Sequence, residues 1–148
     1  MIEGVTIIPL PKFCNDQGCV YKMLSENDPF FRHFGEIYFS SILPGVIKGW
    51  NLHTQIDANM ACVSGDVRLV LYDRRSDSIS SKTIQEVLMG EKNYCLVQIP
   101  HGVAYSWKAL GDKQALIGNC ATASHDPQES IKIALASGEI PYQWKEQT

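Results

Sequence analysis

The sequence predicts an all-β fold, a barrel or sandwich of short antiparallel strands. Most of the chain divides into short segments rich in β-branched and aromatic residues, separated by clusters of turn-forming residues. These segments cover residues 5–10, 19–24, 36–43, 58–64, 67–73, 83–89, 94–99, 104–109 and 114–120. No long helical pattern lies between them, which argues against a parallel sheet with helical crossovers. The 148 residues are the length of one ordinary domain, and we expect residues 1–148 to form it.

One short helix is expected late in the chain, between Asp126 and Gly138. Asp126 is a suitable N-cap, Pro127 fits the first turn, and Glu129 stands where a capping box needs an acidic residue. The buried stripe of this helix would be formed by Ile131, Ala134 and Leu135. We expect the helix to cover an edge or the mouth of the barrel.

The composition indicates a globular protein with no affinity for nucleic acid. Hydrophobic residues make up 45% and charged residues 20%, and the net charge is −3 with no basic run. No apolar stretch approaches the roughly 20 residues that span a bilayer, and residues 1–4 lack the features of a signal peptide. We therefore expect a cytoplasmic protein that does not bind a membrane.

The cysteine pattern favours free thiols over disulfides. The five cysteines are odd in number and form no Cys-x-x-Cys motif, and in a reducing cytoplasm thiols stay unpaired. Cys14 and Cys19 have no matching second pair that would complete a structural zinc site. We expect all five to be buried thiols.

Two glycine-containing segments, residues 45–53 and 99–105, resemble the paired signature of the cupins, which are small jelly-roll barrels. The first cupin segment usually carries two histidines one residue apart, where this chain has Asn51 and His53. The second usually ends in a histidine, where this chain has Tyr105. The resemblance therefore implies a cupin-type barrel that works without a metal or other cofactor. His53 and Asp57 alone approach ligand spacing, which leaves a metal-dependent cupin enzyme as a third alternative.

Further motifs follow one another along nearly the whole chain. They are Asp16-Gln17-Gly18, Ser41 through Gly49, the run from Gly65 to Ser78, residues 99–104, and the late Thr122, Pro127 and Trp144. In order and spacing they resemble the sugar-nucleotide 3,5-epimerase family, best known for dTDP-4-dehydrorhamnose 3,5-epimerase. The resemblance implies a homodimer in which amino-terminal strands of one subunit join the sheet of the other. Residues 5–8 and 19–24 would form the exchanged strands.

The family's chemistry removes a proton next to the C4 ketone of a nucleotide-linked sugar and returns it on the opposite face. The resemblance implies a His–Asp dyad and a tyrosine. The position of the family base is Asn51, and an amide cannot accept a proton at neutral pH. The dyad's carboxylate would lie near Ser137, yet no aspartate follows Asp126. The tyrosine position aligns with His125. The resemblance therefore implies that the catalytic positions are altered.

Other side chains are candidates to replace the missing groups. His53 lies two residues after Asn51, so in a strand both point to the same face. His53 is either a displaced base or a structural histidine, and His125 is either a proton donor or a loop residue. Tyr105 either lines the cavity or is an ordinary barrel tyrosine.

Four further residues are candidates for binding the substrate. Lys48 and Arg75 stand where the family keeps basic residues, which suit a diphosphate. The alternative for Arg75 is a solvated hairpin turn. Trp50 and Trp107 could stack on a sugar or base, or belong to the core.

Two functions of different class remain open. The first is a dTDP-4-dehydrorhamnose 3,5-epimerase-like isomerase acting on a nucleotide-diphosphate sugar in deoxysugar or polysaccharide biosynthesis. The second is a catalytically impaired cupin that binds a sugar nucleotide or a partner subunit without turnover. The survival of His53 and of the basic positions favours the enzyme.

Overall fold

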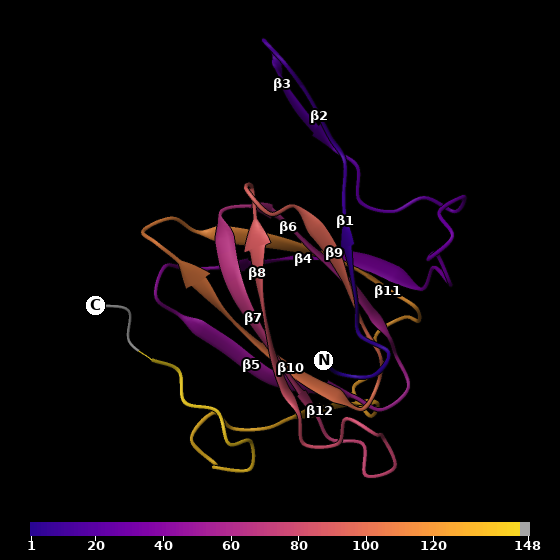
Figure 1. Ribbon diagram of the computed structural model, residues 1–148, viewed down its shortest axis with the longest axis vertical. Helices are drawn as coiled ribbons and strands as arrows, with labels where there is room; N and C mark the ends of the chain where they lie inside the picture. The colour runs from indigo at the N-terminus through magenta and orange to yellow at the C-terminus, as the bar shows by residue number, and fades with distance from the viewer. Residues whose placement is uncertain (146–148) are drawn as a thin grey trace.

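The computed structural model describes residues 1–145, and in this part of the chain the secondary structure is entirely β (Figure 1). Two five-stranded antiparallel sheets face each other, in the orders β1-β9-β6-β11-β4 and β12-β5-β10-β7-β8, and β2 and β3 form a separate hairpin. The strands are β1 (Thr6–Pro9), β2 (Lys12–Asn15), β3 (Gly18–Tyr21), β4 (Glu36–Ile42), β5 (Ile47–His53), β6 (Ala58–Ser64), β7 (Asp66–Asp73), β8 (Ile84–Gly90), β9 (Cys95–Ile99), β10 (Val103–Leu110), β11 (Ala115–Ala121) and β12 (Ser130–Lys132). The expected all-β jelly-roll class is confirmed.

The main hydrophobic core lies between the two sheets, as the alternation of apolar residues along the strands predicts. Val67, Leu69 and Leu71 of β7 are fully buried there, and they pack in one cluster with Met60 of β6 and Ile117 of β11. The same alternation leaves every second residue for the outer faces of the sheets. The core therefore fixes which side chains of β5 and β10 point inward.

The outer faces of the sheets are covered unequally. Trp50 and Tyr72 on the outside of the second sheet are buried beneath the C-terminal segment, through Ile133 and Ile140. The outside of the first sheet is covered over β6 and β9 by residues 21–30 together with Ile8 and Leu10. Its edge strand β4 is left bare, with Phe39 59% exposed.

The expected C-terminal helix is wrong, because residues 130–132 form the strand β12. This strand pairs with the edge of β5, with Ser130 opposite His53 and Lys132 opposite Asn51. An isolated helix of three turns is marginal in water, whereas the free backbone groups of an edge strand are satisfied by one more strand. Within residues 1–145 there is no helix with the length and apolar character to span a bilayer.

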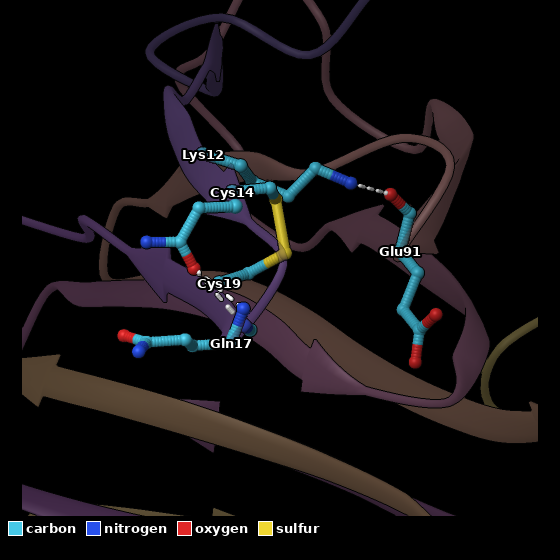
Figure 2. The surroundings of a disulfide bond; sticks show 7 residues. Lys12, Cys14, Gln17, Cys19 and Glu91 are labelled. Atoms are coloured by element: carbon cyan, nitrogen blue, oxygen red, sulfur yellow. Dashed lines mark hydrogen bonds between the residues drawn. A yellow bond between two sulfur atoms is a disulfide. The ribbon is translucent and has the colours of Figure 1, made fainter.

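The expectation of five free thiols is also wrong. Cys14 and Cys19 face each other across the β2–β3 hairpin and form a disulfide (Figure 2). The spacing of the two residues gave no motif, but the hairpin register places them directly opposite. The remaining cysteines, Cys62, Cys95 and Cys120, are buried thiols as expected.

The β2–β3 hairpin extends away from the two sheets (Figure 1). Both strands are exposed along almost their whole length, and Phe13 and Val20 are 61% and 65% exposed. At its base, the Lys12 ammonium donates to the carbonyl oxygen of Glu91 (Figure 2). The hairpin is thus tethered to the sheets at its base and free of them at its tip.

Candidate active site

A cavity of about 320 Å³ lies between the two sheets, where the edge strands β4 and β12 leave the barrel open. One wall consists of residues from β4 and β11, and the other of residues from β5, β10 and β12. Its polar lining includes Tyr38, Asn51, His53, Tyr105, Asn119 and His125, with Lys48 and Lys132. The cavity therefore gathers imidazole, phenol, amide and ammonium groups in one space.

His53 and Glu129 form a hydrogen-bonded pair in the wall of this cavity. The His53 Nδ1 lies 2.5 Å from Oε1 of Glu129, whose side chain is only 5% exposed. The other carboxylate oxygen accepts hydrogen bonds from the backbone N–H groups of Gln55, at 2.9 Å, and Ile56, at 2.8 Å. The pair forms because β12 places Ser130 opposite His53, so that Glu129 reaches the end of β5.

The carboxylate of Glu129 is held in its charged form. Burial by itself would raise its pKa, but the hydrogen bonds from His53, Gln55 and Ile56 outweigh burial, and the net pKa is lowered. A carboxylate only accepts hydrogen bonds, so the proton between the two groups belongs to Nδ1 of the imidazole. In the neutral imidazole this leaves Nε2 as a proton acceptor on the side away from Glu129.

Tyr105 of β10 lies on that side. Its hydroxyl is 3.1 Å from Nε2 of His53, and the two rings lie nearly parallel with centroids 6.0 Å apart. Burial, with smaller contributions from Tyr38 and Glu129, raises the pKa of Tyr105. Tyr105 is therefore a neutral phenol that can donate a hydrogen bond to His53 or to a ligand.

The structure brings together most of the residues that the sequence singles out. Asn51, His53, Tyr105, Trp107 and His125 all line the cavity. Trp107 is 5% exposed, and within residues 1–145 its indole N–H has no hydrogen-bond partner. His125 is exposed, in the segment between β11 and β12. The base position and the tyrosine position suggested by the resemblance thus surround the same cavity as His53.

The basic lining of the cavity comes from two lysines. Lys48 donates to the hydroxyl of Ser40 at 2.7 Å and to the carbonyl oxygen of Ser41 at 3.1 Å. Lys132 of β12 lies on the same wall as His53. Both side chains belong to exposed residues, so their ammonium groups meet a ligand at the mouth of the cavity.

Two expected binding residues lie elsewhere. Arg75 forms an ion pair with the fully buried carboxylate of Asp73, with Nε 2.8 Å from Oδ1, and it lines a neighbouring groove of about 540 Å³ that shares His53 and Lys132 with the cavity. Trp50 is 2% exposed and packs edge-to-face against Tyr142 in the core outside the second sheet. Neither residue lines the cavity that contains Tyr105.

The pairing of His53 with Asp57, considered as a start for a metal site, does not form. The carboxylate of Asp57 instead contacts His101 Nδ1 at 2.9 Å and Arg32 at 3.4 Å. Among residues 1–145, no group of three or more His, Cys, Asp or Glu side chains converges as metal ligands would. The side chains with acid–base groups that line the cavity include Tyr38, His53, Tyr105 and His125.

Sequence reasoning missed four residues of the site, Glu129, Tyr38, Asn119 and Lys132. Glu129 satisfied the capping pattern of a helix that does not form. Tyr38 carried a readable signal, because it alternates with Glu36 along a strand and all even positions of that strand point inward. Asn119 is the cross-strand partner of Tyr38, and it can be identified only when the pairing of β4 with β11 is known.

Comparisons with known proteins agree with this architecture. A dTDP sugar isomerase from Desulfovibrio desulfuricans G20 has a crystal structure that matches with a TM-score of 0.95 and 36% identity, covering 97% of this chain and 92% of that one. A dTDP-6-deoxy-D-glucose-3,5-epimerase from Legionella pneumophila, solved with dTDP-4-keto-L-rhamnose, shares the fold at 20% identity, with a TM-score of 0.85 over 97% of this chain and 80% of that one.

Sequence comparisons identify the family. The Bacillus subtilis spore coat polysaccharide biosynthesis protein SpsL is 33% identical over 129 residues, which are 87% of this chain and 85% of that protein. A sequence profile described as dTDP-4-dehydrorhamnose 3,5-epimerase matches residues 1–148. The resemblance of the motifs is confirmed, and the chain belongs to the dTDP-4-dehydrorhamnose 3,5-epimerase family.

Proposed function

We propose that this chain epimerises a dTDP-linked 4-keto-6-deoxy sugar in its barrel cavity, by metal-independent proton transfer with the His53–Glu129 pair as the base. The geometry of this pair carries the proposal. A buried carboxylate fixes the tautomer of an imidazole whose free nitrogen faces the cavity, which is the arrangement of an oriented general base. The family and the dTDP-sugar ligand of the Legionella relative support the substrate class.

The chemistry needs a base and a group that stabilises the enolate. Removal of the proton next to the C4 ketone breaks a C–H bond, and the electron pair moves onto the C4 oxygen. His53 Nε2 takes the proton, and the negative charge of Glu129 stabilises the imidazolium that forms. Tyr105, kept neutral by its raised pKa, donates a hydrogen bond to the developing oxyanion.

The remaining polar groups of the cavity suit the rest of the substrate. Lys48 and Lys132 supply positive charge for the diphosphate at the mouth, a role that we no longer give to Arg75. We assign the indole N–H of Trp107, which has no hydrogen-bond partner within residues 1–145, to a sugar hydroxyl, and exposed His125 to the nucleotide. Asn51 is placed to hold a sugar hydroxyl rather than a proton.

The alternative function, binding of a sugar nucleotide without turnover, rested on the loss of a base at Asn51. The pairing of His53 with Glu129 supplies a base on the same face. We place the reaction in cytoplasmic deoxysugar biosynthesis. SpsL of Bacillus subtilis and the probable low-salt glycan biosynthesis epimerase Agl13 of Haloferax volcanii, 32% identical over 62% of this chain and 60% of that protein, are named for sugar polymers.

A homodimer is part of the proposal. The β2–β3 hairpin extends from the sheets (Figure 1). Phe13 and Val20 of the hairpin are exposed, and on the bare face of β4 Ile37 is 53% and Phe39 59% exposed. A hairpin of one subunit that covers the β4 face of another would bury both apolar surfaces. Light scattering that finds a 16.5 kDa monomer at micromolar concentration would exclude this assembly.

Incubation with dTDP-4-keto-6-deoxy-D-glucose in D₂O tests the enzyme directly. We expect solvent deuterium at C3, C5 or both in the wild-type reaction, read by proton NMR. His53→Ala should lower exchange by about 10²–10⁴-fold, while dTDP binding measured by calorimetry stays within a few-fold. Exchange that survives His53→Ala would contradict the assignment of the base, and wild-type protein that binds dTDP without exchange would be a binder instead.

A further inference from the structure

Tyr38 is a second tyrosine of the cavity, and it belongs to the wall opposite His53. It projects from β4 of the first sheet, whereas His53 and Tyr105 project from β5 and β10 of the second. Tyr38 is 39% exposed, so a ligand in the cavity can touch its hydroxyl. The cavity thus presents acid–base side chains from both sheets, with Tyr38 on the wall of the first.

The hydroxyl of Tyr38 is oriented by Asn119. The Asn119 Nδ2 donates to it at 2.8 Å, and the amide cannot be turned around because Oδ1 accepts from the backbone N–H of Asn59 at 3.0 Å. Tyr38 therefore accepts from Asn119, and its own proton is directed to the cavity side, where Tyr105 is its polar neighbour.

The amide of Asn119 is itself held by a buried polar network. Asn59 Nδ2 donates to the carbonyl oxygen of Cys120 at 2.9 Å, and Gln98 Nε2 donates to Oδ1 of Asn59 at 2.8 Å. Asn59, Gln98 and Asn119 are 4%, 7% and 2% exposed. Burying an amide costs free energy unless its groups are hydrogen-bonded. In this network the last hydrogen bond is the one from Asn119 to the hydroxyl of Tyr38.

We propose that Tyr38 is the proton donor on the sugar face opposite His53, and that Asn119 is its positioning residue. The proposal rests on the proposed epimerase function. Inversion at carbon requires that the proton leaves from one face and arrives on the other, so a second group must stand across the substrate from the base. Tyr38 is the phenol of the opposite wall, and Asn119 leaves its proton available.

The step is balanced in protons and charge. The C–H bond breaks, its proton goes to Nε2 of His53, and the electron pair forms the enolate. The O–H bond of Tyr38 then breaks, its proton bonds to carbon on the other face, and Tyr38 is left as phenolate beside an imidazolium. The Tyr105 hydroxyl is 3.1 Å from His53 Nε2, and Tyr38 is near enough to contribute to the raised pKa of Tyr105. Tyr105 can therefore pass a proton from His53 to Tyr38 and restore both groups.

The test uses Tyr38→Phe with dTDP-4-keto-6-deoxy-D-glucose in D₂O and two NMR readouts. One is the rate at which inverted product forms, and the other is the entry of deuterium into recovered, uninverted substrate. We expect inversion to fall about 100-fold or more, the usual cost of losing an acid–base group. Deuterium entry into substrate should stay within a few-fold of wild type, because His53 still removes a proton and returns a deuteron to the same face.

Two further variants make the result specific. Asn119→Asp replaces the Nδ2 donor that faces Tyr38 with an acceptor oxygen, so the hydroxyl of Tyr38 donates its proton to Asp and no longer to the sugar. Inversion should therefore fall while deuterium entry continues. Tyr72→Phe removes a phenol hydroxyl in the core outside the second sheet and should leave both rates unchanged.

Equal loss of inversion and deuterium entry in Tyr38→Phe would overturn the proposal, since a merely structural side chain would affect both alike. Wild-type inversion in that variant would overturn it as well. Wild-type protein that shows neither readout would instead remove the proposed function and this inference with it, a result visible before any variant is made. Thermal melting of Tyr38→Phe close to that of wild type verifies that the variant is folded.

Discussion

Two buried carboxylates, Glu129 and Asp73, are paired with basic side chains, and only the pair at Glu129 faces the cavity. Glu129 holds His53, whose second nitrogen is open toward Tyr105 and the cavity. Asp73 at the end of β7 holds Arg75 at 2.8 Å and also accepts from the hydroxyls of Ser78 and Ser80, each at 2.7 Å. Both carboxylates are buried and charged, so burial and charge alone do not distinguish a functional site.

The difference lies in the partner. A guanidinium does not lose its proton in the physiological range, and at Asp73 all the bound groups belong to the chain itself. The pair at Glu129 ends in an imidazole that can gain and lose a proton, beside a cavity that can hold a ligand. Asp73 should therefore matter for folding and Glu129 for turnover, and the predictions below test this division.

The largest effect is expected from Glu129→Gln. The amide keeps the volume but loses the charge that stabilises the imidazolium, and it presents an N–H group toward either His53 or the backbone donors. We expect kcat to fall by about 10²–10⁴-fold with dTDP affinity within a few-fold. Steady-state kinetics and calorimetry measure both quantities.

The matched control is Asp126→Asn, which removes a nearby charge from an exposed turn. Its Oδ1 accepts from the backbone N–H of Gln128 at 2.9 Å, and the amide oxygen can do the same. Its kcat should equal that of wild type. A Glu129→Gln enzyme with wild-type kcat would show that the pair is as structural as the one at Asp73.

The second prediction concerns Asp73→Asn, which leaves Arg75 without its ionic partner. Removing one member of a buried pair typically costs about 3–5 kcal/mol of unfolding free energy, and we expect about 3 because the Arg75 side chain is 23% exposed and regains some water. Denaturant unfolding measures this loss, and exposed Asp77→Asn in the same loop should change stability by less than about 0.5 kcal/mol. Activity per folded molecule should not change in either variant.

The pH dependence of this loss sharpens the prediction. Burial would raise the pKa of Asp73, but the hydrogen bonds from Arg75, Ser80 and Ser78 hold it well below its usual range. A folded pKa below the unfolded one contributes stability that is present above about pH 4 and lost as pH falls through the folded value. The difference in unfolding free energy between wild type and Asp73→Asn should therefore become smaller from pH 7 to about pH 3. A difference independent of pH would mean that the lost stability does not come from the charge of Asp73.

The sequence predicted the fold and the inward direction of His53, but not its partner. Strand positions follow from β-branched residues and turns, and the period of two places His53 on the same face as Asn51. The position of Glu129 depends on whether residues 126–138 form a helix or a strand. The local pattern of Asp126 and Pro127 satisfies a helix start, and the open edge of β5 that favours β12 exists only in the assembled sheet.

The ion pair of Arg75 and the disulfide of the cysteines were not predicted, for similar reasons. A basic residue at a family position suggests a phosphate ligand. Only the structure shows that Asp73, two residues before Arg75, is fully buried and pairs with it. Cys14 and Cys19 show no spacing motif, and their pairing follows from the register of a hairpin whose turn, Asn15-Asp16-Gln17-Gly18, was visible in the sequence. In each case the deciding neighbour is set by pairing between strands rather than by local sequence.

The smallest effect is expected from the double change Cys14→Ser and Cys19→Ser. A disulfide across so short a loop removes about 2 kcal/mol of chain entropy from the open hairpin. The hairpin is exposed on both strands and extends from the sheets, so this entropy stabilises the hairpin rather than the barrel. We expect the melting temperature of the barrel to shift by less than about 2 °C, while amide hydrogen exchange in residues 12–21 speeds up by roughly tenfold or more. A melting temperature lowered as far as in Asp73→Asn would show instead that the hairpin unfolds together with the barrel, as it would if it were docked on the β4 face of a second subunit.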